Sequence, residues 1–414
     1  MIANRIKKLK LINEFYFFRI VFQISSYFMY TFYLILLYRQ SNDIKILVID
    51  SIIFYVGMWV GFIFGSFALQ RIGYVNTFRL SFFFTALAGL AIAISIPQIA
   101  LLFPVLSLLR GFGRGMFWPV YHTYTVKEFN VAERSSIISI VTSTGLLLDI
   151  AFPFLVGTLI SSTGDYTLVY IIGSTILLTA IFLRFGYNKM PATNITSGEI
   201  TRILKNKIFI KFGVLTVFNE MLNIVYVLIM LVLPFIITRN EGNTGAILSI
   251  VNLVAALTAF SQRKKQVNKG IGIAGLGYLF GIIGALILIV LWSTLGIALS
   301  MIFFILAISL AGPLEEKLVI YIKQKILGDQ KNQSTIELNM VIETLYLVGR
   351  MAGLVIFLLC FSFNDDIGNI FRIFILMCAL WSCINVFYLA KIAKSHKKEL
   401  ADINLPASPQ ELPA

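Results

Sequence analysis

The chain has 414 residues, of which 58% are hydrophobic and 13% are charged, and its formal net charge is +14. This composition excludes an ordinary water-soluble globule, because too few polar residues are present to cover one, and it requires a bilayer as solvent. Backbone groups in lipid must be satisfied within each segment, and apolar runs of about 20 residues suit helices. We therefore expect an all-α integral membrane protein.

Twelve long apolar segments follow one another along the chain, with predicted limits 12–37, 47–69, 78–96, 99–121, 137–160, 167–186, 212–237, 245–261, 271–292, 295–314, 338–362 and 368–390. Most lysines and arginines lie at the termini or in every second gap, and only Arg39, Lys45 and Arg239 lie in the other gaps. Because basic loops stay in the cytoplasm, both termini are predicted to lie inside. Topology and anionic lipid explain the charge, and we expect no nucleic-acid partner because no recognition fold accompanies it.

The polar gap after the sixth segment divides the chain into two bundles of six helices. We predict an N-terminal bundle over residues 1–186, a cytoplasmic linker over 187–211, a C-terminal bundle over 212–392 and a disordered cytoplasmic tail over 393–414. In the linker, Thr196 and Glu199 have the spacing of a capping box, which predicts a short surface helix.

Opposite charges lie at the same predicted depth in two neighbouring segments. Arg110 falls near the middle of segment 99–121, and Asp149 falls near the middle of segment 137–160. A charge at the bilayer centre costs about 2.5–3.5 kcal/mol, so we expect the two to form an ion pair. Such a pair can lock two helices together or take part in transport, and the sequence leaves both open.

Two further arginines have no obvious acidic partner. Arg114 lies one turn inward of Arg110, and Arg19 of the first segment lies at a similar depth. Uncompensated positive charge invites an anionic group, so we assign all three to a substrate cavity. The alternative partner is Glu14, lower on the first segment, which would make the network structural.

The first segment carries a polar stripe at helical spacing, formed by Arg19, Gln23, Ser26, Tyr27 and Tyr30. A polar stripe in a membrane helix is expected to face an aqueous cavity. Hydrogen bonding to neighbouring helices is the alternative.

Segments 212–237 and 338–362 supply the charges of the second half. The former carries Asn219, Glu220, Asn223 and Tyr226, and the latter carries Glu343 and Arg350 two turns apart, with Glu220 between them in depth. We assign Asn219, Asn223, Tyr226 and Arg350 to the cavity. A carboxylate that can meet an arginine or water is a candidate proton carrier, which applies to Asp149, Glu220 and Glu343. A static pair of Glu220 with Arg350 is equally open.

Glycines spaced four apart predict close helix packing, at Gly57, Gly61 and Gly65 and again at Gly349 and Gly353. No nucleophile set, metal-spaced cluster or phosphate-binding loop is present in the sequence. We therefore expect no enzyme activity, no metal and no cofactor.

Twelve spans arranged six plus six, with both ends inside, resemble the major facilitator superfamily of secondary transporters. Arg71 and Gly73 match the family signature between helices 2 and 3, while Gln70 and Tyr74 depart from it. Arg110 resembles the arginine that many members carry on helix 4.

Segment 137–160 also resembles the family's antiporter signature in part. Pro153 and Gly157 match it, and Phe152 stands where the signature has glycine. The resemblance implies that helices 1, 4, 7 and 10 line a cavity and that the two bundles alternate about a site near the membrane midplane.

We therefore expect a monomeric secondary transporter of a small organic solute, working as a proton-coupled efflux system in contact with membrane lipid. Arg19, Arg110 and Arg114 would favour an anionic or zwitterionic group, and protons are the expected coupling ion. The expected location is a bacterial plasma or inner membrane, with multiple spans. The alternative function is a non-transporting receptor or scaffold on a transporter-like fold.

Overall fold

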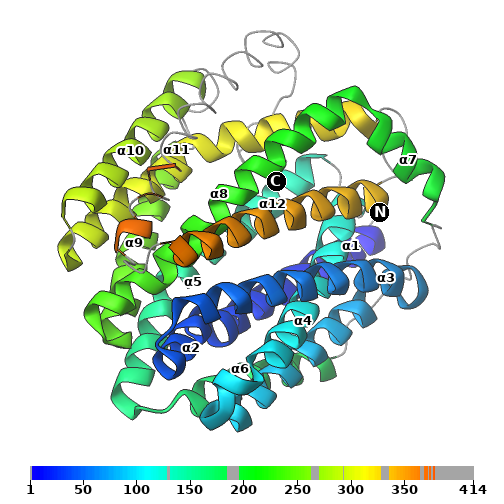
Figure 1. Cartoon of the computed structure of the whole chain (residues 1–414). Coiled ribbons are helices and arrows are strands. Elements are labelled where there is room, and N and C mark those ends of the chain that lie inside the picture. Colours follow the sequence, from blue (N-terminus) through cyan, green and yellow to red (C-terminus); the bar gives the residue numbers. More distant parts are fainter. Residues whose placement is uncertain are drawn as a thin grey trace.

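The computed structural model describes residues 2–127, 131–183, 195–262, 270–291, 293–327, 335–363, 368–371, 373 and 376–377. Within these ranges the chain forms helices with short connections and contains no strand, so the all-α class is confirmed (Figure 1). The first half contains α1 (Ile2–Ser26), α2 (Tyr33–Ser41), α3 (Ile44–Ser95), α4 (Ile99–Lys127), α5 (Val131–Thr163) and α6 (Tyr166–Phe182). The linker and second half contain α7 (Ser197–Lys205), α8 (Lys207–Thr238), α9 (Glu241–Gln262), α10 (Gly270–Val290), α11 (Thr294–Leu327) and α12 (Thr335–Phe363).

Each predicted segment up to 338–362 has a helical counterpart in this order. Within the described residues, five stretches are long and apolar enough to cross a membrane, and the longest, Ile44–Thr125, contains three predicted segments. The twelfth predicted segment, 368–390, and the predicted tail, 393–414, lie mostly or entirely outside the described residues.

Gly73 separates two predicted segments that otherwise run together in α3. Its φ of 80° and ψ of −179° lie in a region that a residue with a Cβ atom rarely adopts. Arg71 is exposed beside this break. A tight kink thus occupies the gap between the predicted segments 47–69 and 78–96.

The first predicted segment, 12–37, is not one continuous α-helix. A π-helical turn, η1 (Tyr27–Thr31), joins α1 to α2. The wider turn rotates the face that follows, and Tyr30, Thr31 and Leu34 all line the cavity described below. The apolar pattern did not predict this turn, because the residue types on either side of it are those of an ordinary membrane helix.

Among the described residues, two contacts between the first half and the second are the most extensive. One runs between α5 and α9, which lie side by side in Figure 1, and the other runs between α3 and α12. At the first, Gly157 and Gly245 each lie against the backbone of the opposite helix. At the second, Trp59 Nε1 donates a hydrogen bond to Thr344 Oγ1 at 3.0 Å.

Polar side chains join the two halves at one end of the α5–α9 contact. Glu241 Oε1 accepts hydrogen bonds from Arg39 Nη1 at 2.9 Å and from Tyr166 OH at 2.7 Å. Beside them, Asn240 Nδ2 donates to Ser161 Oγ at 3.3 Å. The charge pattern of the sequence predicts that this end faces outward.

Helices α3 and α4 pack backbone against backbone. A Cβ atom on Gly57, Gly61 or Gly65 of α3 would run into the α4 backbone, and one on Gly111 or Gly115 of α4 would run into α3. Small residues on both sides of the contact let the helices approach more closely than larger side chains allow. The glycine face of the second segment therefore finds its partner on the fourth.

A similar contact positions the charged residues of the second half. Gly349 and Gly353 of α12 lie against the backbone of α8, at Val217 and Met221 respectively. Glu220, between those two α8 residues, is thereby brought beside α12.

A buried ion pair crosses the α3–α4 contact. Arg110 Nη2 donates to Asp50 Oδ2 at 2.8 Å, and Ser107 Oγ donates to the other carboxylate oxygen. The two charged side chains are 4% and 0% exposed, and the Arg110 guanidinium carbon lies 3.6 Å from the centre of the Tyr33 ring. The carboxylate thus supplies the countercharge that Arg110 requires in an apolar core.

The linker contains the short helix predicted there, α7, but not the predicted capping box. The Thr196 side chain makes no cap hydrogen bond, and its backbone N–H donates to Glu337 Oε1 at 3.4 Å. Glu199 pairs with Arg202 at 2.7 Å instead of reaching back to Thr196. Ile203 anchors α7 by packing against residues of α8 and α12.

Substituting Gly61 with alanine tests the backbone contact. We expect Gly61→Ala to lower the free energy of unfolding by about 1–3 kcal/mol, because the new Cβ atom would collide with the Phe112 backbone. Thermal unfolding in detergent micelles measures this loss. The matched control is Gly145→Ala, where a Cβ atom meets nothing within 4 Å and no loss is expected. Equal stability of the two variants would contradict the proposed contact.

The buried ion pair makes a second prediction. Asp50→Asn and Arg110→Gln should each destabilise the protein by about 3–5 kcal/mol, because each leaves a buried charge without its partner. The double variant should recover part of that loss, which a double-mutant cycle of thermal unfolding measures. Arg202→Gln, at an exposed pair on α7, serves as control and should change stability by less than about 1 kcal/mol. Single variants as stable as this control would rule out the pair as a structural element.

Candidate functional site

A cavity of about 640 Å³ lies between the two halves. Helices α1, α2, α3, α4 and α5 line it from the first half, together with η1, and α8 and α12 line it from the second. Its charged lining residues are Arg19, Asp50, Arg110, Arg114, Asp149, Glu343 and Arg350. A volume of this size suits a small organic molecule.

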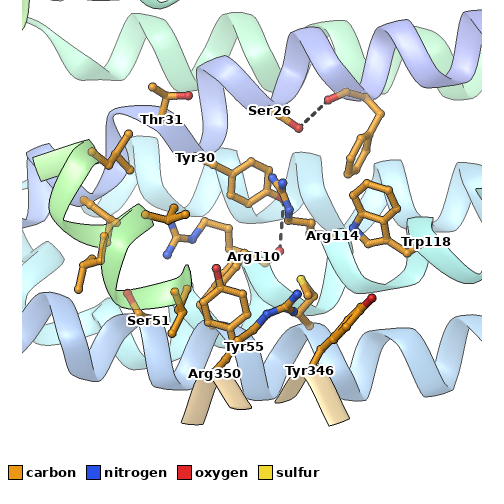
Figure 2. Close-up of a pocket in the computed structure, with 18 of the residues that line it drawn as sticks. Ser26, Tyr30, Thr31, Ser51, Tyr55, Arg110, Arg114, Trp118, Tyr346 and Arg350 are labelled. Carbon is orange, nitrogen blue, oxygen red and sulfur yellow. Dashed lines mark hydrogen bonds between the residues drawn. The ribbon is translucent and has the colours of Figure 1, made fainter. Parts of the chain in front are cut away.

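The polar stripe of the first segment lies on the cavity wall, with all of its members among the lining residues: Arg19, Gln23, Ser26, Tyr27 and Tyr30. Several of them also bond to neighbouring side chains and helices. Gln23 Nε2 donates to Tyr27 OH and to Asp149 Oδ1, both at 2.9 Å. Tyr30 OH donates to the carbonyl oxygen of Arg110 at 3.3 Å (Figure 2). The stripe therefore combines the two roles that the sequence left as alternatives.

The ion pair predicted between Arg110 and Asp149 is wrong, because Arg110 pairs with Asp50. Asp149 accepts from Gln23 on its side chain, and its carbonyl oxygen accepts from Asn252 Nδ2 of α9 at 2.8 Å. The depth argument fixed the height of each charge but not its direction around the helix. The glycine contact turns Arg110 toward α3, whereas α5 packs against α1 and α9.

Arg19 and Arg114 form no ion pair with a carboxylate in the part of the chain that the structure describes. Glu14, the alternative partner considered for Arg114, is therefore not paired with it. The Arg19 guanidinium carbon lies 5.7 Å from the centre of the Trp118 ring, and that of Arg114 lies 4.5 Å from the Tyr30 ring. Figure 2 shows Arg114 between Tyr30 and Trp118 on one side of the cavity.

Helix α8 presents a different face to the cavity from the one predicted. Its lining residues are Ile224, Val227, Leu228 and Leu231. Asn219, Asn223 and Tyr226 are not among them, and the ring of Tyr226 lies 4.9 Å from that of Phe304 on α11. The helical period explains the error, because the three predicted residues share one face and the lining residues share another whose centre lies about 120° further round.

Arg350 of α12 gathers the acidic residues of the second half. Its Nε donates to Glu220 Oε2 at 2.7 Å, and its Nη1 donates to Glu343 Oε1 at 3.3 Å. The guanidinium carbon lies 5.0 Å from the Tyr55 ring centre and 5.3 Å from that of Tyr346, as the close-up in Figure 2 shows. Two carboxylates therefore share one arginine at the edge of the cavity.

The residues of the family signatures lie where helices meet and not in the cavity lining. Gly73 forms the kink of α3, with Arg71 exposed beside it. At the α5–α9 contact, the Pro153 carbonyl oxygen faces Gly245 and Gly157 faces the Glu241 backbone. Their position bears on how the halves approach each other.

Among the lining residues that sequence reasoning missed are Asp50, Tyr55 and Tyr346. Asp50 lies near the end of its predicted segment, 47–69, and was therefore not considered as a partner for charges near the middle of other segments. Tyr55 and Tyr346, which flank Arg350, carry no signal that separates them from other aromatic residues of membrane helices. A signal for Asp50 was present in the sequence. Asp50 lies seven residues, or about two helical turns, before Gly57 and therefore on the same face as the glycines.

Comparison with known proteins identifies the family. The sequence profile described as Major Facilitator Superfamily matches residues 15–319 of this chain. No curated protein sequence matches it significantly.

Solved structures of transporters share the fold at low sequence identity. The human organic anion transporter MFSD10 superposes with a TM-score of 0.65 at 11% identity, over 92% of this chain and 99% of that one. A POT family transporter in complex with a thioalcohol-conjugated peptide gives 0.68 at 13%, over 92% and 96%. The E. coli fucose:proton symporter gives 0.59 at 12%, over 93% and 98%. The profile match covers well over half of the sequence, and this chain therefore belongs to the major facilitator superfamily of membrane transporters.

Proposed function

We propose that this chain is a secondary active transporter that moves a small organic solute across the membrane by alternating access. The observation that carries the proposal is the cavity between the two halves, whose walls combine arginines, carboxylates and aromatic rings. A solute held there would touch both halves, so rocking one half against the other would expose it to either side in turn. We place the protein in a bacterial plasma or inner membrane.

In this proposal the described conformation is the inward-facing one. The bonds of Glu241 to Arg39 and Tyr166 close the end that the charge pattern assigns to the outside. Between that end and the cavity, Asn252 of α9 bonds to the carbonyl oxygen of Asp149. Release of these bonds would accompany the opposite, outward-facing state.

We further propose that protons drive the movement and that efflux is its direction. Asp149 lines the cavity and is bonded to a neutral amide rather than to an arginine, so gain of a proton leaves no arginine unpaired. Glu220 and Glu343 share Arg350, so one of them can take a proton while the other keeps the pair. Pro153 and Gly157, which resemble the antiporter signature, support the direction.

A receptor or scaffold on the same fold is the rival function. The observation that favours it is the ion pair of Asp50 and Arg110, because a pair buried this completely serves to hold two helices together. Reconstitution into liposomes with an imposed pH gradient separates the two, after a screen of solutes by thermal stabilisation. Protein that no solute stabilises and that moves no protons would favour the scaffold.

Neutralising Asp149 tests the coupling. Asp149→Asn should abolish proton-driven transport in liposomes while leaving the protein folded, because asparagine can still accept the hydrogen bond from Gln23. The control is Asp165→Asn, at the N-cap of α6 and outside the cavity, which should transport normally. Normal solute movement and proton movement by Asp149→Asn would remove this residue from the coupling mechanism.

The closed end makes a second functional prediction. In a variant without native cysteines that carries Ser249→Cys at the α5–α9 contact, removal of the Glu241 bonds should expose the new thiol. Glu241→Ala should raise its rate of labelling by a membrane-impermeant maleimide about fivefold or more, because about 1 kcal/mol shifts a two-state population by that factor. Arg39→Gln should have a smaller effect, since Arg39 is 53% exposed.

Arg202→Gln, on α7 and away from this end, serves as the control and should leave labelling unchanged. Labelling that stays slow in Glu241→Ala would show that these bonds do not hold the end closed.

A further inference from the structure

The arginines that line the cavity fall into two groups. Arg110 and Arg350 are each paired with carboxylates. Arg19 and Arg114 line the same cavity without an ion pair among the described residues. Their charges lie against aromatic rings but are not neutralised by a described carboxylate, and a charge in an apolar environment is stable only when it is paired or wet.

Arg19 and Arg114 border one pair of rings that pack edge to face. The centres of the Phe22 and Trp118 rings lie 6.0 Å apart. The guanidinium carbon of Arg19 lies 5.7 Å from the Trp118 ring, and that of Arg114 lies 5.8 Å from the Phe22 ring. The two positive charges are close enough to repel each other. Both arginines therefore serve one region of the wall.

A second observation at this place points to a ligand. The buried Nε of Arg19 has no hydrogen-bond acceptor in the described part of the protein. Buried donors are satisfied in the great majority of cases, so an acceptor supplied from outside the chain is the expected partner. Guanidinium groups present several N–H donors in a fixed plane, which suits the oxygens of a carboxylate or sulfonate.

The number of charges on this wall limits the charge of the partner. Asp149 lines the same cavity as these arginines, and it is bonded to Gln23. While Asp149 is ionised, two arginines and one aspartate leave one positive charge, because Asp50 and Arg110 cancel each other. A solute with a single negative charge neutralises the wall, whereas a doubly charged one would leave an unpaired negative charge.

The opposite wall of the cavity is apolar where α8 faces it. Ile224, Val227, Leu228 and Leu231 form a row along that helix. No charged residue of α8 is among the lining residues, since Glu220 is held beside Arg350. A solute that fits both walls therefore has an apolar body as well as a charged group.

We propose that the cavity binds an amphipathic organic monoanion, a carboxylate or sulfonate on an apolar or aromatic body, with its oxygens on Arg19 and Arg114 and its body against the α8 row. This anion would be the substrate of the transporter proposed above, and calling it a substrate rests on that proposed function. The cavity volume suits a single small molecule rather than a phospholipid with two acyl chains.

Equilibrium binding to the purified full-length protein in detergent tests the class, with calorimetry as the readout. Naphthoate and naphthalenesulfonate are the probes. We expect naphthamide, naphthylmethylamine and acetate to bind at least about tenfold more weakly than naphthoate. The first two lack the negative charge, and acetate lacks the apolar body. Naphthyl phosphate, as a dianion, should bind more weakly than naphthoate. Phosphatidylglycerol in mixed micelles should not displace naphthoate.

Substitutions test the assigned residues. Arg19→Gln and Arg114→Gln should each weaken naphthoate binding by about tenfold to a hundredfold, the loss expected for a hydrogen bond to a charged group. Arg114→Lys, which keeps the charge, should lose less, and Val227→Asn should weaken naphthoate without changing acetate. Arg202→Gln, exposed on α7, is the matched control and should bind normally. Thermal unfolding of each variant checks that it is folded.

The result that overturns the proposal is naphthamide or the amine binding as tightly as naphthoate, or folded glutamine variants that bind naphthoate normally. Displacement by phosphatidylglycerol would assign the site to membrane lipid and overturn it too. Because binding needs no gradient, these outcomes are separate from transport. Arginine-dependent binding without any solute movement would contradict the proposed transport function but not the anion site. Transport of only neutral or cationic solutes would contradict the anion site but not the transport function.

Discussion

The buried ion pair between Asp50 and Arg110 decides which arginines remain to act on a solute. Each charge placed near the centre of a bilayer costs about 2.5–3.5 kcal/mol on the insertion scale, so an unpaired arginine there requires a reason. Asp50 removes that requirement for Arg110, and the glycine contact of α3 with α4 makes the pairing possible by bringing the two backbones together. Arg114 lies one turn beyond Arg110 and pairs with no described carboxylate, which leaves its charge to the cavity.

The acidic residues of the two halves have different bonding partners. In the first half, Asp149 accepts a hydrogen bond from the Gln23 amide and forms no ion pair with an arginine among the described residues. In the second half, Glu220 and Glu343 both bond to Arg350, and the positive charge is used up within the protein. A negatively charged solute of the proposed class would therefore be attracted to one wall only. That asymmetry would orient the bound solute, with its charged end toward the first half.

Depth along a helix was a sound guide to which charges share a level, but not to which charges meet. Glu220 was placed between Glu343 and Arg350 in depth, and Arg350 does bond to both acids. The same reasoning failed for Arg110 and Asp149, because rotation about the helix axis decides the partner and a single sequence does not reveal it. Rotation also decided α8, where Tyr226 packs toward α11 and takes its neighbouring asparagines off the cavity face. The glycine spacings were more informative, since a residue without a side chain marks the contact face directly.

The closed end is built so that it can reopen at small cost. At the α5–α9 contact, Gly157 and Gly245 meet through backbone atoms, so separating the helices withdraws few interlocked side chains. Hydrogen bonds between polar side chains also join the halves at this end, and Glu241 accepts two of them. A transporter needs its two states within a few kcal/mol of each other, so that a solute or proton can shift the balance by its difference in affinity. A glycine contact held by an acid with one exposed partner and one buried partner meets that requirement, whereas an interdigitated apolar seam would hold one state too firmly.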